Sequence, residues 1–133
     1  MSFTLGIVGT GHISSALVIG LCTSKAPPKR ILVSPRNAET AARLAARFPS
    51  IVSVAASNQV VVDGSDWVVL SIRPQIAQEV VTALTFKPGQ TVLSLVAPIA
   101  LDWIDEAVKP GILASRFLIM PPVERRLGPV AFY

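Results

Sequence analysis

The chain has 133 residues, about the length of one domain, and its composition excludes disorder. Hydrophobic residues make up 51% of it and charged residues 15%, whereas disordered chains are poor in apolar residues and rich in charge. The mean hydropathy of +0.58 raises the question of a membrane span. However, the apolar runs Met1–Val8 and Trp67–Ile72 are each under about ten residues, and a spanning helix needs roughly 20. Short apolar runs are typical of strands buried on both faces of a parallel sheet.

The charge distribution favours a small anionic ligand. Twelve Lys and Arg residues against eight Asp and Glu residues give a net charge of +4. No carboxylate precedes Glu39, whereas basic residues are frequent there: Lys25, Lys29, Arg30 and Arg36. These residues are not interleaved with aromatic residues and form no dense run, so nucleic acid is the less favoured partner. A smaller anion would be attracted by the same charges, and no membrane partner is expected.

The inventory of reactive side chains is small. The single cysteine, Cys22, excludes an internal disulfide and favours a reducing, cytoplasmic setting. Its place on an apolar helix face indicates a core residue and not a reactive one. One histidine and one cysteine supply no zinc-ligand cluster and no nucleophile–base pair with a third orienting group. The sequence therefore predicts no metal site and no hydrolytic triad, and it identifies no catalytic residue.

Strand and helix patterns alternate along the whole chain. The predicted strands are Phe3–Val8, Ile31–Ser34, Ile51–Ala55, Trp67–Ile72, Thr91–Val96, Leu113–Ile119 and a short last one over Pro129–Tyr133. Between them the patterns predict helices over Gly11–Thr23, from the Asn37 cap to near Phe48, over Gln75–Leu84 and over Ala100–Val108. A short segment to Asp63, capped by Ser57 or Asn58, follows the third strand. The run of valines before Asp63 leaves the helicity of that segment open. The alternation predicts βαβ units with right-handed crossovers. The expected fold is α/β: a Rossmann-type doubly wound, mostly parallel sheet with helices on both faces.

A glycine-rich turn, Gly9 to Ser14 (GTGHIS), follows the first predicted strand and opens the first predicted helix. This is the context that the dinucleotide-binding fingerprint demands. Gly9 would permit the tight turn, and Gly11 would let the backbone approach a pyrophosphate at the helix N-terminus. Ser14 stands in place of the usual third glycine or alanine and is small enough for close packing. The alternative is an ordinary strand-to-helix turn.

On this interpretation residues 1–133 form one dinucleotide-binding domain. For His12, a contact through its backbone N–H and plain exposure in the loop are both open, and a catalytic role is not expected. The residues predicted to surround the pyrophosphate are Gly9, Thr10, Gly11, His12 and Ile13.

The loop after the second predicted strand favours NADP(H) over NAD. Sites that prefer NAD carry an Asp or Glu there to hold the ribose 2′-OH, but this loop reads Ser34-Pro35-Arg36-Asn37. The Arg36 guanidinium could clamp a 2′-phosphate or stack on adenine, and Ser34 and Asn37 could donate hydrogen bonds. A carboxylate would repel that phosphate, so its absence supports the same choice. The alternative is a solvated arginine at the start of a helix.

Taken together, several segments resemble pyrroline-5-carboxylate reductase and its relatives, including the deazaflavin-dependent NADP reductase group. The matching stretches are Leu5–Ser14, Val33–Asn37, Ser57-Asn58 and Asp66–Gln75. The likeness covers almost the whole chain but only the N-terminal half of the family's proteins. It implies that Ile72, Arg73 and Pro74 lie along the cofactor, that Asn58 contacts its adenosine end, and that Val96 and Ala97 belong to the cofactor site. The alternative for Arg73 and Pro74 is a surface arginine followed by a turn proline, and the alternative for Asn58 is a helix N-cap.

The sequence departs from the family pattern at three places, and the last of them, near the nicotinamide, leaves the exact substrate open. The family usually carries lysine where Arg73 stands and an Ala-Ala-Gly turn where Val96-Ala97-Pro98 stands. It also carries Met-Pro-Asn-Thr-Pro near the nicotinamide, where this chain has Met120–Glu124.

The resemblance implies an NADPH-dependent reductase of a C=N bond, with a cyclic imino acid as its substrate: 1-pyrroline-5-carboxylate, reduced to L-proline in proline biosynthesis. The family's helical second domain, which forms the dimer and completes the substrate pocket, has no counterpart after Tyr133. We therefore expect this chain alone to be inactive and the full-length form to be a homo-oligomer. The alternative, from another class, is a nucleotide-binding regulatory or interaction domain without turnover.

Overall fold

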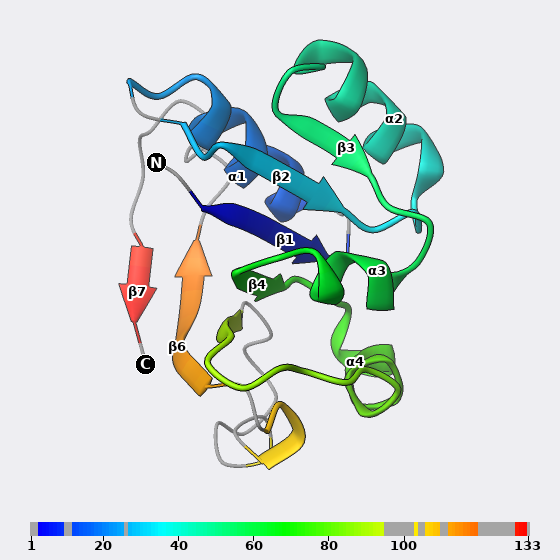
Figure 1. Cartoon of the computed structure of the whole chain (residues 1–133), viewed down its shortest axis with the longest axis vertical. Coiled ribbons are helices and arrows are strands. Elements are labelled where there is room, and N and C mark those ends of the chain that lie inside the picture. The colour runs from blue at the N-terminus through cyan, green and yellow to red at the C-terminus, as the bar shows by residue number, and fades with distance from the viewer. Residues whose placement is uncertain are drawn as a thin grey trace.

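The computed structural model describes residues 3–9, 12–25, 27–94, 103, 106–109, 112–119 and 130–132. Within them strands and helices alternate in the predicted order (Figure 1). The elements are β1 (Thr4–Val8), α1 (His12–Cys22), β2 (Arg30–Val33), α2 (Ala38–Arg47), β3 (Val52–Val54), α3 (Asn58–Asp63), β4 (Trp67–Leu70), α4 (Pro74–Thr82), β5 (Thr91–Ser94), β6 (Ile112–Ile119) and β7 (Val130–Phe132).

Within the described residues the strands form one seven-stranded sheet in the order β3-β2-β1-β4-β5-β6-β7 (Figure 1). Neighbouring strands from β3 to β6 are parallel, and β7 pairs antiparallel with β6. The first six strands have the order of the doubly wound dinucleotide-binding fold, in which the chain crosses from one side of β1 to the other before β4. The predicted Rossmann-type fold is confirmed.

Alternate side chains of each strand face opposite layers of helices. In β2, Ile31 and Val33 join the buried cluster that includes residues of α1 and α2, whereas Leu32 joins the cluster that includes residues of α3 and α4. Because helices cover both faces of the sheet, the central strands β1 and β4 bury consecutive apolar residues, as in Ile7-Val8 and Val68–Leu70, which accounts for the hydrophobic runs of the sequence. None of the described helices is long and apolar enough to cross a membrane.

Helix α3 packs against the sheet through a glycine in β1. A Cβ atom at Gly6 would lie 2.2 Å from Ser65 Oγ and 2.8 Å from Val61 Cγ1. The Ser65 hydroxyl is held there by a 2.6 Å hydrogen bond to the Val61 carbonyl oxygen. The absence of a side chain at Gly6 therefore lets α3 approach the centre of the sheet.

Cys22 lies at the end of α1 and packs, partly buried, against the cluster beneath α1 and α2. Burial raises the pKa of its thiol to about 11, and the nearby Arg47 guanidinium offsets only part of that rise. The thiol is therefore protonated at neutral pH, as expected for a core cysteine.

The position predicted for the cap of α2 is confirmed, but the expected hydrogen bond from its side chain is not formed. Asn37 does occupy the N-cap position, but its backbone is left-handed (φ 63°, ψ 55°) and its side chain makes no capping hydrogen bond. A capping side chain needs an extended backbone at that residue, whereas asparagine tolerates the left-handed region better than most residues. The carbonyl oxygen of Asn37 instead accepts the first helical hydrogen bond, from Ala41 N.

The open question over the next segment is resolved in favour of a helix. Ser57 has the extended backbone of an N-cap, and its hydroxyl accepts a 3.2 Å hydrogen bond from Val60 N. Asn58 is the first residue of α3. Helix α4 begins one residue earlier than predicted, at Pro74. Proline fits the first turn because the N–H that it lacks would have no partner within the helix there.

Some predicted elements fall partly outside the described residues. This holds for most of the predicted helix over Ala100–Val108, although Trp103, Glu106 and Ala107 are helical. The last two residues of the predicted strand Thr91–Val96 also lie outside, and β5 ends at Ser94.

We predict that Gly6→Ala destabilises the fold by about 1–3 kcal/mol, because the added methyl group must displace Ser65 or Val61 in a packed interior. Urea denaturation followed by circular dichroism measures this directly. A change below about 0.5 kcal/mol, the range of ordinary surface substitutions, would contradict the close approach of α3.

Candidate cofactor-binding site

The strand order places a topological switch point between β1 and β4. The two strands are parallel neighbours in the middle of the sheet, with Val8 opposite Leu70 at their carboxyl ends. The connection after β1 leads to α1, whose residues join one face's core, and that after β4 leads to α4 on the other face. Ligands of open α/β sheets bind in the crevice that forms at such a point.

Gly9, the first residue after β1, is tightly enclosed at this crevice. Its φ is +96°, and a Cβ atom built on it would lie 2.0 Å from the carbonyl oxygen of Ser71 after β4. Its conformation and its space therefore both require glycine, as predicted for the tight turn.

The residue that follows β2, Ser34, also contacts Gly9. Ser34 is wholly buried, and its hydroxyl accepts a 2.9 Å hydrogen bond from Gly9 N. Its backbone N–H donates to the Ile7 carbonyl oxygen at 3.0 Å. Ser34 thus fixes the glycine turn to the loop that carries Arg36, while its predicted donation to a 2′-phosphate stays a prediction.

Two adjoining clefts extend from the glycine turn. The first, about 290 Å³, is lined by Gly9, Arg36, Asn37, Ser71, Ile72, Arg73 and Ile76. The second, about 420 Å³, is lined by Arg36, Ser57, Asn58, Gln59, Ile76, Glu79, Val80, Ala83 and Leu84. Because Arg36 and Ile76 border both clefts, together they form one groove along the carboxyl edge of the sheet. The structure therefore brings together Gly9, Arg36, Asn37, Asn58, Ile72 and Arg73, six of the residues predicted from the sequence.

The other predicted residues are placed less fully. Thr10, Gly11, Val96 and Ala97 lie outside the described residues. His12 and Ile13 form the first turn of α1, next to the glycine turn, and Pro74 is the first residue of α4.

The sequence analysis missed the apolar wall of the groove. Ile76 and Val80 lie four residues apart on α4, which places them on one side of that helix. Such spacing was available in the sequence, but it does not by itself distinguish a groove from a core. Both side chains are half-buried: they pack against the core cluster and leave part of their apolar surface exposed in the cleft.

The far wall of the second cleft is fixed by an amide. The Gln59 side chain donates to the Thr85 carbonyl oxygen and accepts from Thr85 N, both at 2.9 Å. It also donates to Asp63 at 3.0 Å. The two bonds to Thr85 tie α3 to the segment after α4.

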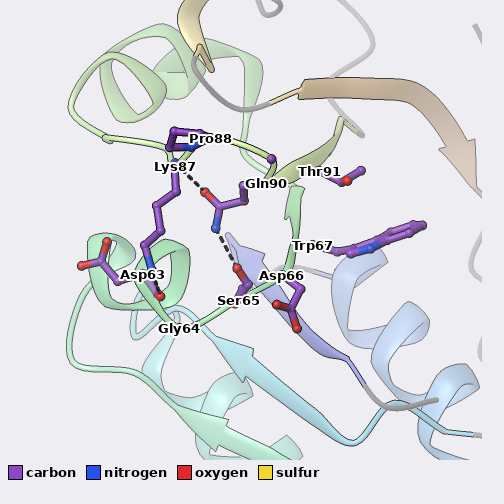
Figure 2. A pocket seen from close by; sticks show the side chains of 10 residues that line it. Asp63, Gly64, Ser65, Asp66, Trp67, Lys87, Pro88, Gln90 and Thr91 are labelled. Atoms are coloured by element: carbon purple, nitrogen blue, oxygen red, sulfur yellow. Dashed lines mark hydrogen bonds between the residues drawn. The ribbon is translucent and has the colours of Figure 1, made fainter.

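A further cleft, of about 340 Å³, lies at the opposite edge of the sheet, around the start of β4 and β5 (Figure 2). Its polar groups bond to one another. The Gln90 side chain donates to the carbonyl oxygens of Val62 and Ser65 at 2.6 and 2.7 Å, and its own oxygen accepts from Lys87 N at 3.1 Å. The Lys87 ammonium group donates to the Asp63 carbonyl oxygen. Hydrogen bonds in this cleft join the segment before β4 to the segment before β5, and the cleft lies away from the switch point.

Comparison with known proteins agrees with this geometry. Residues 4–98 match the family described as NADP oxidoreductase, coenzyme F420-dependent. The chain belongs to this family. It is also 34% identical over 97 residues to the pyrroline-5-carboxylate reductase of Pseudomonas aeruginosa, an alignment that covers 71% of this chain and 35% of that protein. The Pisum sativum enzyme of the same name is 34% identical over 133 residues, covering 98% of this chain and 46% of the relative.

Solved structures give the same relationship. A 1-pyrroline-5-carboxylate reductase from Streptococcus pyogenes superposes with a TM-score of 0.81 at 25% identity, covering 99% of this chain and 48% of that one. A Plasmodium falciparum pyrroline carboxylate reductase with NADP bound shares the fold, with a TM-score of 0.77 at 18% identity and coverage of 98% and 47%. The family resemblance inferred from the sequence is confirmed. The chain spans less than half the length of each of these four proteins.

We predict that Ser34→Ala weakens the binding of NADPH and NADH alike, by roughly three- to tenfold, because one buried hydrogen bond to the glycine turn is worth about 1 kcal/mol. Fluorescence titration measures both affinities. Ser34→Thr, which keeps the hydroxyl, should retain most of the binding. Ser53→Ala on edge strand β3 is the matched control and should change neither. Unaltered affinities in Ser34→Ala would contradict the positioning role of Ser34.

Proposed function

We propose that this chain is the NADP(H)-binding domain of a reductase that acts on a C=N bond, with 1-pyrroline-5-carboxylate as the substrate of the full-length form and L-proline as the product. The observation that carries the proposal is the groove at the switch point: Arg36 borders both of its clefts, Gly9 lines the first and Asn58 lines the second. The relatives named pyrroline-5-carboxylate reductase support the substrate.

The described residues fit a dinucleotide phosphate. A Cβ at Gly9 would collide with the Ser71 carbonyl oxygen, so this position keeps the tight glycine turn that the dinucleotide-binding fingerprint requires after the first strand. Arg36 borders both clefts, and the loop after β2 carries no carboxylate to repel a 2′-phosphate. When bound, NADPH supplies the hydride, and the protein supplies binding and orientation.

Each part of the groove has a distinct task in this proposal. The Arg36 guanidinium binds the 2′-phosphate through charge-assisted hydrogen bonds, and Asn37 stands beside it in the first cleft. Ile76 and Val80 offer the adenine an apolar surface, and Asn58 contacts the adenosine end. Ile72, Arg73 and Pro74 lie along the cofactor. Beyond the described residues, we assign Thr10, Gly11, Val96 and Ala97 to the same site on the family resemblance, together with the first turn of α1.

We propose further that turnover needs more residues than these 133. Hydride transfer requires the acceptor carbon to be held against the nicotinamide in a near-attack geometry. Among the described residues, the groove offers one carboxylate, Glu79, and no built pocket for an imino acid beside it. In the resembling family a helical domain completes the substrate pocket and forms the dimer. We place the protein in the cytoplasm, in keeping with a single cysteine that cannot form an internal disulfide.

We predict that the chain binds NADPH about tenfold or more tightly than NADH, a difference of about 1.4 kcal/mol that one charge-assisted contact can supply. Arg36→Ala should weaken NADPH binding much more than NADH binding. Calorimetric titration of both nucleotides against both proteins measures this, and equal affinities in the unmodified chain would rule out the assignment of Arg36.

We also predict that these 133 residues do not turn over 1-pyrroline-5-carboxylate, because the acceptor is not held in place. NADPH absorbance, followed with and without the imino acid, tests this. Sustained oxidation of NADPH that depends on the substrate would refute the need for a second domain. If a longer chain also binds NADPH but reduces no imine, the alternative of a regulatory nucleotide-binding domain would be favoured.

A further inference from the structure

We propose that Arg73 is a second cation of the 2′-phosphate site and sets the preference for NADP jointly with Arg36. This inference rests on the proposed function and deepens it. The family resemblance places Arg73 only somewhere along the cofactor, whereas the structure places it on the cleft that Arg36 also borders.

The two arginines come from different strand ends and border the same space. Arg36 follows β2 and Arg73 follows β4, on either side of β1 in the sheet. Both side chains are exposed, and both line the 290 Å³ cleft next to Gly9. The loops after β2 and β4 are both fixed at the glycine turn, because the Gly9 N–H bonds to Ser34 on one side and Gly9 packs against Ser71 on the other.

The charges of this cleft are unbalanced in a way that fits a doubly charged anion. Within the part of the chain that the structure describes, neither the Arg36 nor the Arg73 guanidinium forms an ion pair. The described residues that line the cleft include no carboxylate, and Glu79 lies in the adjoining cleft. Two like charges that border one cleft repel each other weakly and attract an anion between them. A phosphate monoester carries about −1.5 to −2 charges at pH 7 and accepts several hydrogen bonds.

The choice of the 2′-phosphate over the pyrophosphate follows from the neighbours of Arg73. Its cleft also contains Arg36 and Asn37, the loop expected to read the ribose, and it adjoins the cleft of Asn58 at the adenosine end. The pyrophosphate is assigned to backbone N–H groups at the start of α1. An arginine, with its planar fork of donors, can bind a phosphate through two hydrogen bonds at once.

The backbone at Arg73 is well suited to present the side chain. Its carbonyl oxygen accepts a 3.1 Å hydrogen bond from Ile76 N, and Pro74 follows in the first turn of α4. The proline ring fixes the backbone at the start of the helix. Since the Arg73 side chain itself is exposed, replacing it should leave the fold intact.

The test compares NADPH and NADH affinities, by calorimetry on the full chain, for the unmodified protein and for Arg73→Ala, Arg73→Lys and Arg36→Ala. Arg73→Ala should weaken NADPH about tenfold and NADH less than about twofold, the range of a charge-assisted contact to the phosphate alone. Arg73→Lys keeps the charge but loses the planar fork of donors, so it should weaken NADPH binding by less than Arg73→Ala does. Arg30→Ala removes the same charge at the opposite end of β2 and should change neither affinity.

Each other outcome is informative. If Arg73→Ala weakens both nucleotides equally, Arg73 serves a group common to both and the proposal is overturned. It is also overturned if Arg73→Lys loses as much as Arg73→Ala, because charge would then not be the cause. If Arg36→Ala abolishes the preference while Arg73→Ala keeps it, only this inference fails and the proposed function stands. If the unmodified chain binds neither nucleotide, the proposed function itself fails.

Discussion

The structure of the site depends on the crowding of three strand ends around Gly9. Its N–H donates to the buried hydroxyl of Ser34 after β2, and its Cα faces the carbonyl oxygen of Ser71 after β4 so closely that no Cβ fits. A side chain at this position would push β1 away from β4 or break the bond to Ser34. The left-handed conformation that satisfies both neighbours is open to glycine at little cost. One residue therefore sets the distance between the loops on either side of β1.

This constraint determines which side chains border the groove. The loop after β2 carries Arg36, and the loop after β4 carries Arg73, so the two cations face one cleft because both loops are tied to the same glycine turn. The apolar residues Ile76 and Val80 come from α4, whose start is fixed by the same β4 loop. Charge at one end and apolar surface at the other suit a ligand that has a phosphate next to a flat base.

Much of this arrangement could be predicted from the sequence, because it depends on local patterns. The alternation of strands and helices predicted the doubly wound sheet. Arg36, with no carboxylate in the loop after β2, predicted NADP(H) as the cofactor in place of NAD. Three features could not be predicted, because they depend on contacts between distant residues. The burial of Ser34 follows from its bond to Gly9, which lies 25 residues away. The role of Ile76 as a groove wall depends on where α3 packs, and the left-handed Asn37 depends on how the chain leaves the buried end of β2.

We place the adenosine end of NADP in the groove bordered by Arg36. Amide chemical shifts of the isotopically labelled chain, recorded by NMR during titration with NADPH, test it most directly. We expect the amide signals of Gly9, Arg36 and Asn58 to shift and saturate together, while those of Lys87 and Gln90 at the opposite edge of the sheet stay in place. Shifts confined to Lys87, Gln90 and their neighbours, with Gly9 and Arg36 unmoved, would contradict it.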